Sequence, residues 1–102
     1  MASTRYYRRR FLNRRGYHAG AYVIADVHLE RFGSGASRNV EVCASLTIAD
    51  CGRVTTLDFD MPDARSTANA LYKARLLQEV VNGFVAALEE CARVEDEPEA
   101  LC

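Results

Sequence analysis

The first twenty residues combine arginines with aromatic side chains and contain no acidic residue. The arginines and interleaved aromatics are Arg5, Tyr6, Tyr7, Arg8, Arg9, Arg10, Phe11, Arg14, Arg15 and Tyr17. Guanidinium groups bind phosphate oxygens in a bidentate manner, and tyrosine rings stack on exposed bases. These residue types predict an arm that contacts nucleic acid or a nucleoprotein complex. The alternative is pairing with an acidic protein surface, either that of the chain's own acidic tail or that of another subunit.

The charge of the chain is divided unevenly. The whole chain has 13 Lys/Arg and 14 Asp/Glu, for a net charge of −1, but the six arginines of the arm leave −7 on the remaining residues. Because an acidic body repels phosphate, non-specific binding of nucleic acid by the whole chain is not expected.

Three segments after the arm alternate apolar and polar residues with a period of two, which is typical of half-buried strands. They cover residues 21–32, 39–50 and 53–61. A two-residue turn at Cys51–Gly52 joins the last two segments, and Pro62 ends the third strand because proline cannot donate to a ladder.

The alternation also predicts the register, because a slip of one residue would turn the apolar side chains of a strand to the opposite face. The turn at Cys51–Gly52 sets Leu46 opposite Leu57, and the first hairpin sets Val27 opposite Ala44. The three segments therefore predict an antiparallel meander in the order 1-2-3. Its outer strands have free edges, so edge pairing into a homodimer and edges blunted by charge both remain open.

A long helix is predicted after Pro62, from Thr67 to Ala92, with Ser66 or Thr67 as its N-cap. Its apolar stripe repeats at spacings of four and three, with Ala70, Ala74, Leu77, Val81, Phe84 and Leu88. At 1.5 Å per residue the helix would be about 39 Å long, enough to cover one face of the sheet.

The predicted fold is therefore α+β, with a three-stranded meander and one long C-terminal helix packed on one face. Residues 21–92 form this single βββα domain. Residues 1–20 form the basic arm, either as a short helix or as an extended, disordered segment, and residues 93–102 form an acidic tail.

The predicted register brings His28, Cys43 and Asp60 into one row on the polar face of the sheet. A thiol beside an imidazole is the arrangement of a cysteine nucleophile. However, Asp60 would adjoin the thiol rather than orient His28, and no glycine-rich turn provides an oxyanion hole. The chain is therefore predicted not to be an enzyme.

The polar face is also acidic, with Asp26, Glu30, Glu41, Asp58 and Asp60. A flat sheet face rarely converges ligands on a divalent ion. We therefore expect these carboxylates to repel nucleic acid, with contact to a basic partner protein as the alternative.

Neither a metal nor a cofactor is predicted. No two cysteines have the spacing of a zinc knuckle, and only two histidines are available, among Cys43, Cys51, Cys91, Cys102, His18 and His28. No apolar run reaches the roughly 18 residues of a membrane span, and no long apolar segment follows Arg8–Arg10 as an export signal requires. A cytoplasmic protein with reduced thiols is expected.

The strand–strand–strand–helix order resembles the topology of double-stranded-RNA-binding domains and of arm-type DNA-binding domains. This resemblance implies binding to nucleic acid. Those RNA-binding domains carry a basic cluster at the start of the last helix, where this chain has only Arg65, Lys73 and Arg75.

We therefore predict a small non-enzymatic binding protein whose basic arm contacts nucleic acid or a nucleic-acid-handling complex. The alternative is an inhibitor or adaptor that blocks a protein machine. Phage-encoded inhibitors of bacterial defence, such as anti-CRISPR proteins, are similar to this chain in being short and in lacking catalytic motifs.

Overall fold

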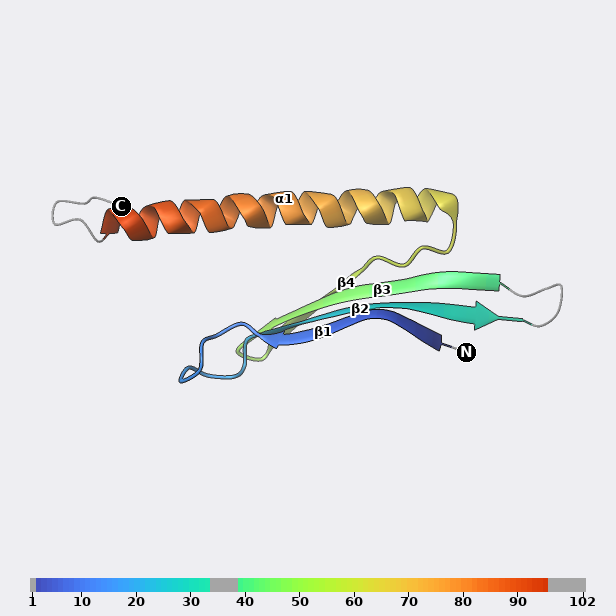
Figure 1. The fold of residues 1–102 in the computed structure, drawn as a ribbon, viewed down its shortest axis with the longest axis horizontal. Helices are drawn as coiled ribbons and strands as arrows, with labels where there is room; N and C mark the ends of the chain where they lie inside the picture. Colours follow the sequence, from blue (N-terminus) through green and yellow to red (C-terminus); the bar gives the residue numbers. More distant parts are fainter. Residues whose placement is uncertain (1, 34–38, 96–102) are drawn as a thin grey trace. The chain divides into compact units, whose positions relative to one another are not determined.

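The structure is a computed structural model that describes residues 2–33 and 39–95 of the chain. It contains four strands and one helix: β1 (Ala2–Phe11), β2 (Tyr22–Phe32), β3 (Asn39–Asp50), β4 (Arg53–Asp58) and α1 (Ala64–Glu95). The strands form one antiparallel sheet in the order β1-β2-β3-β4 (Figure 1). The chain divides into two compact units, the first ending at Leu71 and the second beginning at Tyr72.

The α+β class is confirmed, but the sheet has four strands and not three. Residues 2–11, expected as a helical or extended arm, form the strand β1, which pairs with β2 from Ala2↔Glu30 to Phe11↔Tyr22. The register shifts once, at a bulge between Thr4 and Tyr6. Arginines on both faces of β1 conceal the period-two pattern, whereas its aromatic residues favour a strand and its charges suit a sheet edge.

The register predicted for the other strands is confirmed. Val27 pairs with Ala44, and Leu46 pairs with Leu57. The free edges of the described sheet therefore belong to β1 and β4, because β1 covers the edge of β2 that was expected to be open. A homodimer stays a prediction.

The two-residue turn between β3 and β4 has the expected geometry. Cys51 has a φ of 50° and Gly52 a φ of 83°, and positive values at both positions are typical of a type I′ turn. β4 ends at Asp58, earlier than predicted, because the Asp60 carboxylate, and not a backbone carbonyl, accepts the hydrogen bond from Ala44 N–H. Nevertheless, Met61 N–H still donates to Val42 O at 2.8 Å, so the chain continues beside β3 as far as Met61.

The helix α1 begins three residues before the predicted position. Its N-cap is Asp63 rather than Ser66 or Thr67, because the Asp63 carboxylate accepts a hydrogen bond from Ser66 N–H at 2.7 Å. Hydrogen bonds from Ser66 hold the pKa of Asp63 below its usual range. The carboxylate of an N-cap also suits the positive end of the helix dipole.

α1 continues to Glu95, beyond the start of the predicted tail, and residues 96–102 lie outside the described residues. Among the described residues, no helix is long and apolar enough to cross a membrane. The packing of α1 against the sheet stays a prediction.

Two glycine substitutions should change stability in opposite directions. Gly52→Ala forces a Cβ into the left-handed region and should lower the free energy of unfolding by about 1–2 kcal/mol. Gly83→Ala is the matched control within α1, where an added Cβ meets no atom within 4 Å; it should raise that free energy by about 0.5–1 kcal/mol. Urea unfolding followed by circular dichroism measures both, and a neutral Gly52→Ala variant would contradict the turn geometry.

Asp63→Asn should weaken the pH dependence of stability in the acidic range. The folded-state pKa of Asp63 is lowered, so its charge stabilises the fold above the unfolded pKa of about 3.9. That contribution is lost as the pH falls through the lowered folded pKa. Thermal unfolding between about pH 7 and pH 2 measures this effect. As the pH falls, the melting temperature of the variant should decrease less than that of the wild type. Glu79→Gln, which removes a carboxylate within α1, is the control.

Candidate functional site

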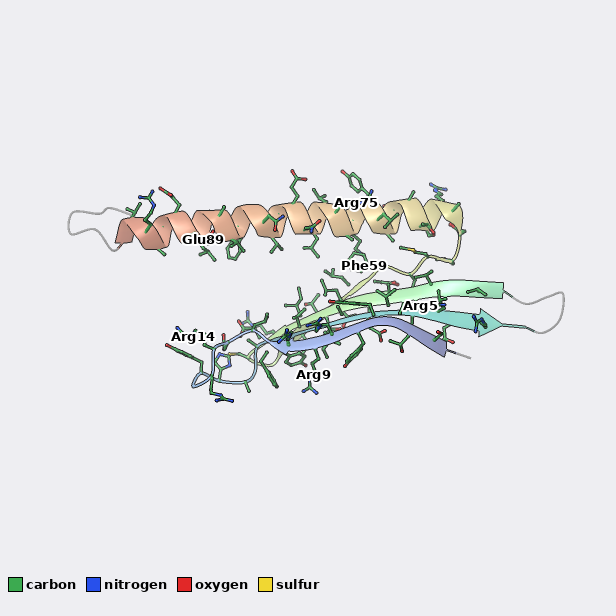
Figure 2. All side chains as sticks on the ribbon, in the orientation of Figure 1. Arg5, Arg9, Arg14, Phe59, Arg75 and Glu89 are labelled. Atoms are coloured by element: carbon green, nitrogen blue, oxygen red, sulfur yellow. The ribbon has the colours of Figure 1, made fainter. Side chains whose placement is uncertain are left out.

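The basic residues of the predicted arm lie on the edge strand β1 and on the β1–β2 loop, residues 12–21. We call this surface the basic edge; it consists of Arg5, Tyr6, Tyr7, Arg8, Arg9, Arg10, Arg14 and Arg15. Arg8 and Arg10 pair with Ala25 and Val23, so they project to the apolar face of the sheet, whereas Arg9 projects to the polar face. Figure 2 labels Arg5, Arg9 and Arg14 along this course.

The basic edge is exposed throughout. All six arginines are exposed, and Tyr6 and Tyr7 expose 50% and 55% of their surface. The Arg9 guanidinium lies 5.6 Å from the centre of the Phe11 ring, which orients it by a cation–π contact. Within the described part of the chain, none of the six arginines forms an ion pair with a carboxylate. No carboxylate of the described residues therefore competes with an external anion for these guanidinium groups.

The β1–β2 loop is closed by its own hydrogen bonds. Leu12 N–H donates to Ala21 O at 2.9 Å, and Asn13 Nδ2 donates to His18 O at 3.0 Å. The loop surrounds an open hollow of about 360 Å³, which is lined by Phe11, Asn13, Arg14, Arg15, Gly16, Tyr17, His18 and Ala19. Guanidinium and aromatic groups around one hollow suit a flat, anionic ligand group such as a nucleotide.

The acidic residues of the polar face are placed in one region, as the register predicted. Asp26 and Glu30 flank His28 on β2, with 3.1 Å from His28 Nδ1 to Asp26 Oδ1 and 3.3 Å from Nε2 to Glu30 Oε1. Each ring nitrogen of His28 thus lies within 3.3 Å of one carboxylate oxygen, so the imidazole is placed between the two acidic side chains. This cluster was missed, although residues two apart on a strand share a face and the signal was in the sequence.

Two further carboxylates, on and just after β4, accept hydrogen bonds from backbone N–H groups. Asp58 accepts from Asp60 N–H at 2.8 Å, and Asp60 accepts from Ala44 N–H at 2.8 Å. Glu41 lies opposite Glu30 in the register, which places two like charges together. The acidic face therefore combines internally bonded carboxylates with a local excess of negative charge.

The predicted row of His28 and Cys43 is present, since the two residues pair across β2 and β3. The imidazole contacts Asp26 and Glu30, and no hydrogen bond to Cys43 is found among the described residues. Partial burial and the Asp60 carboxylate raise the pKa of the Cys43 thiol. This environment opposes formation of the thiolate that a nucleophile needs.

A second thiol lies near the other histidine. His18 in the β1–β2 loop meets Asp50 and Cys51 at the β3–β4 turn, and one ligand atom from each lies within 4.8 Å of the others. Desolvation and a hydrogen bond with Asp50 raise the pKa of Cys51 as well, so this pair is not an activated nucleophile either. Sequence spacing gave no sign of the cluster, because His18 and Cys51 are 33 positions apart.

The chain matches no protein-family model, and no similar curated protein or solved structure was found.

Cys43 should react slowly with iodoacetamide near pH 8, because its raised pKa leaves little thiolate. The exposed Cys91 provides the internal comparison. Asp60→Asn should increase the Cys43 rate and shift its pH profile to lower pH, whereas Glu79→Gln should leave both unchanged. Peptide mass spectrometry measures each thiol separately. A Cys43 rate equal to that of Cys91 would show that the carboxylates do not suppress the thiolate.

Proposed function

We propose that this chain is a small nucleic-acid-binding protein whose contact surface is the basic edge. The observation that supports this proposal most directly is the contrast in charge pairing. Four carboxylates of the acidic face contact His28 or backbone N–H groups, namely Asp26, Glu30, Asp58 and Asp60. The six arginines of the edge have no carboxylate partner among the described residues.

The geometry of the basic edge suits a phosphate backbone. Arg8 and Arg10 lie on one side of β1, two positions apart, which corresponds to about 6.7 Å along a strand. Arg9 lies on the other side, so the edge presents guanidinium groups to both sides. The exposed Tyr6 and Tyr7 rings add surfaces on which unpaired bases can stack.

Ladder hydrogen bonds to β2 hold these groups on a strand, and this reduces the entropy lost on binding relative to a disordered arm. The carboxylates of the polar face would repel phosphate, so the nucleic acid approaches along β1 and the β1–β2 loop. The contacts are mostly to phosphate in this arrangement, and they bring little base specificity.

Replacing two edge arginines should weaken binding and its salt dependence. For Arg8→Gln/Arg10→Gln, the slope of log Kd against log salt should fall by roughly 1.5, since each lost phosphate contact contributes about 0.7–0.9. Fluorescence anisotropy with labelled single-stranded and duplex DNA and RNA, at several salt concentrations, measures this slope. Substitution is preferable to deletion, because removing residues 1–15 would remove the strand β1.

Arg65→Gln/Arg75→Gln on α1 is the control, because it removes the same charge outside the edge. It should leave the slope unchanged. Equal losses of binding affinity in the two double variants would show that only the net charge of the protein determines binding. Absence of binding to all four nucleic acids at low salt would reject the proposal in favour of an acidic protein partner.

A further inference from the structure

Three residues with metal-ligating side chains meet at one end of the sheet. His18 comes from the β1–β2 loop, Asp50 is the last residue of β3, and Cys51 begins the β3–β4 turn. The His18 ring nitrogens lie at 3.5 Å (Nε2) and 4.0 Å (Nδ1) from Cys51 Sγ. No other group of three such side chains lies this close together in the described ranges 2–33 and 39–95.

Backbone contacts hold the loop and the turn together. Cys51 N–H donates to Gly20 O at 3.2 Å, and Gly20 N–H donates to His18 Nδ1 at 3.2 Å. A Cβ on Gly20 would lie 3.3 Å from His18 Nδ1 and 3.5 Å from Cys51 N, so glycine permits this close approach. The juxtaposition of His18 and Cys51 therefore belongs to the hydrogen-bonded architecture of this end of the sheet.

The backbone of Cys51 is a second, independent observation. Among the described residues, Cys51 is the one non-glycine residue with a positive φ. The first position of a type I′ turn favours asparagine, aspartate or glycine, and a cysteine there adopts a disfavoured conformation. A strained residue that places a thiol beside an imidazole and a carboxylate suggests that the side chain itself has a use.

We propose that His18, Asp50 and Cys51 bind a divalent transition-metal ion of the zinc class. Zinc combines nitrogen, sulfur and carboxylate oxygen ligands, whereas calcium and magnesium take oxygen ligands. With bonds of about 2.3 Å to sulfur and 2.0 Å to nitrogen, tetrahedral ligands lie about 3.5 Å apart. The distance from Nε2 to Sγ has this value, 3.5 Å. Three protein ligands leave a fourth position for water or another ligand.

Metal binding must alter the contact between Gly20 and His18. Ligation through Nε2 puts the ring proton on Nδ1, and ligation through Nδ1 replaces the Gly20 hydrogen bond directly. The amide resonance of Gly20 therefore reports binding through either nitrogen. An ion bound to His18 and Cys51 would also link the β1–β2 loop, which carries Arg14 and Arg15, to the β3–β4 turn.

Cobalt(II) titration of the full chain tests the site. We expect one equivalent to bind, with thiolate-to-cobalt absorption in the near ultraviolet, displacement by Zn²⁺ and a shift of the Gly20 amide resonance. Cys51→Asn is the sharpest variant, since asparagine suits the turn and keeps the fold while removing the thiol. It should abolish the thiolate absorption, and His18→Ala should weaken binding at least about tenfold.

Cys91→Ser, which removes an exposed thiol from α1, is the matched control and should leave cobalt binding unchanged. Thiolate absorption that persists in Cys51→Asn, or absence of stoichiometric binding to the wild type, would overturn the proposal. The result is independent of the proposed function. Anisotropy with metal-free protein tests the basic edge, and Arg8→Gln/Arg10→Gln should still bind cobalt.

Discussion

The antiparallel ladder between β1 and β2 is the constraint on which the rest of this structure depends. It holds a strand with six nearby arginines against an acidic sheet, and it places Arg8 and Arg10 on one face with Arg9 on the other. The same pairing sets the ends of the β1–β2 loop, closed by Leu12 and Ala21, and so positions His18. Without the ladder, the basic segment would be a separate arm and the loop would have no fixed neighbours.

The electrostatic organisation follows from this ladder. A basic strand at the edge of an acidic sheet creates a directional field, whereas a basic tail of the same charge would not. His28 is central to the acidic side, because its imidazole lies between Asp26 and Glu30 and contacts both carboxylates. The positive edge and the negative face are thus built into one rigid sheet, which favours an orientation for any charged partner.

Much of the fold could be predicted because its information is local. Strict alternation in three strands determined which residues face each other, as the pairs Val27↔Ala44 and Leu46↔Leu57 show. The predicted helix start is wrong, because Ser66 is not the N-cap but donates its N–H to the Asp63 carboxylate. The strand β1 was missed because arginines occupy both of its faces, so hydrophobic alternation was absent.

The sequence by itself determined the charge asymmetry, the meander of β2, β3 and β4, and a long helix after Pro62, since each depends on composition or on a short repeat. Only the tertiary structure decided that the basic segment is an edge strand and that His18 lies beside Cys51. These two features depend on backbone hydrogen bonds between segments distant in sequence. No local pattern of side chains specifies such bonds, because every residue offers the same backbone groups.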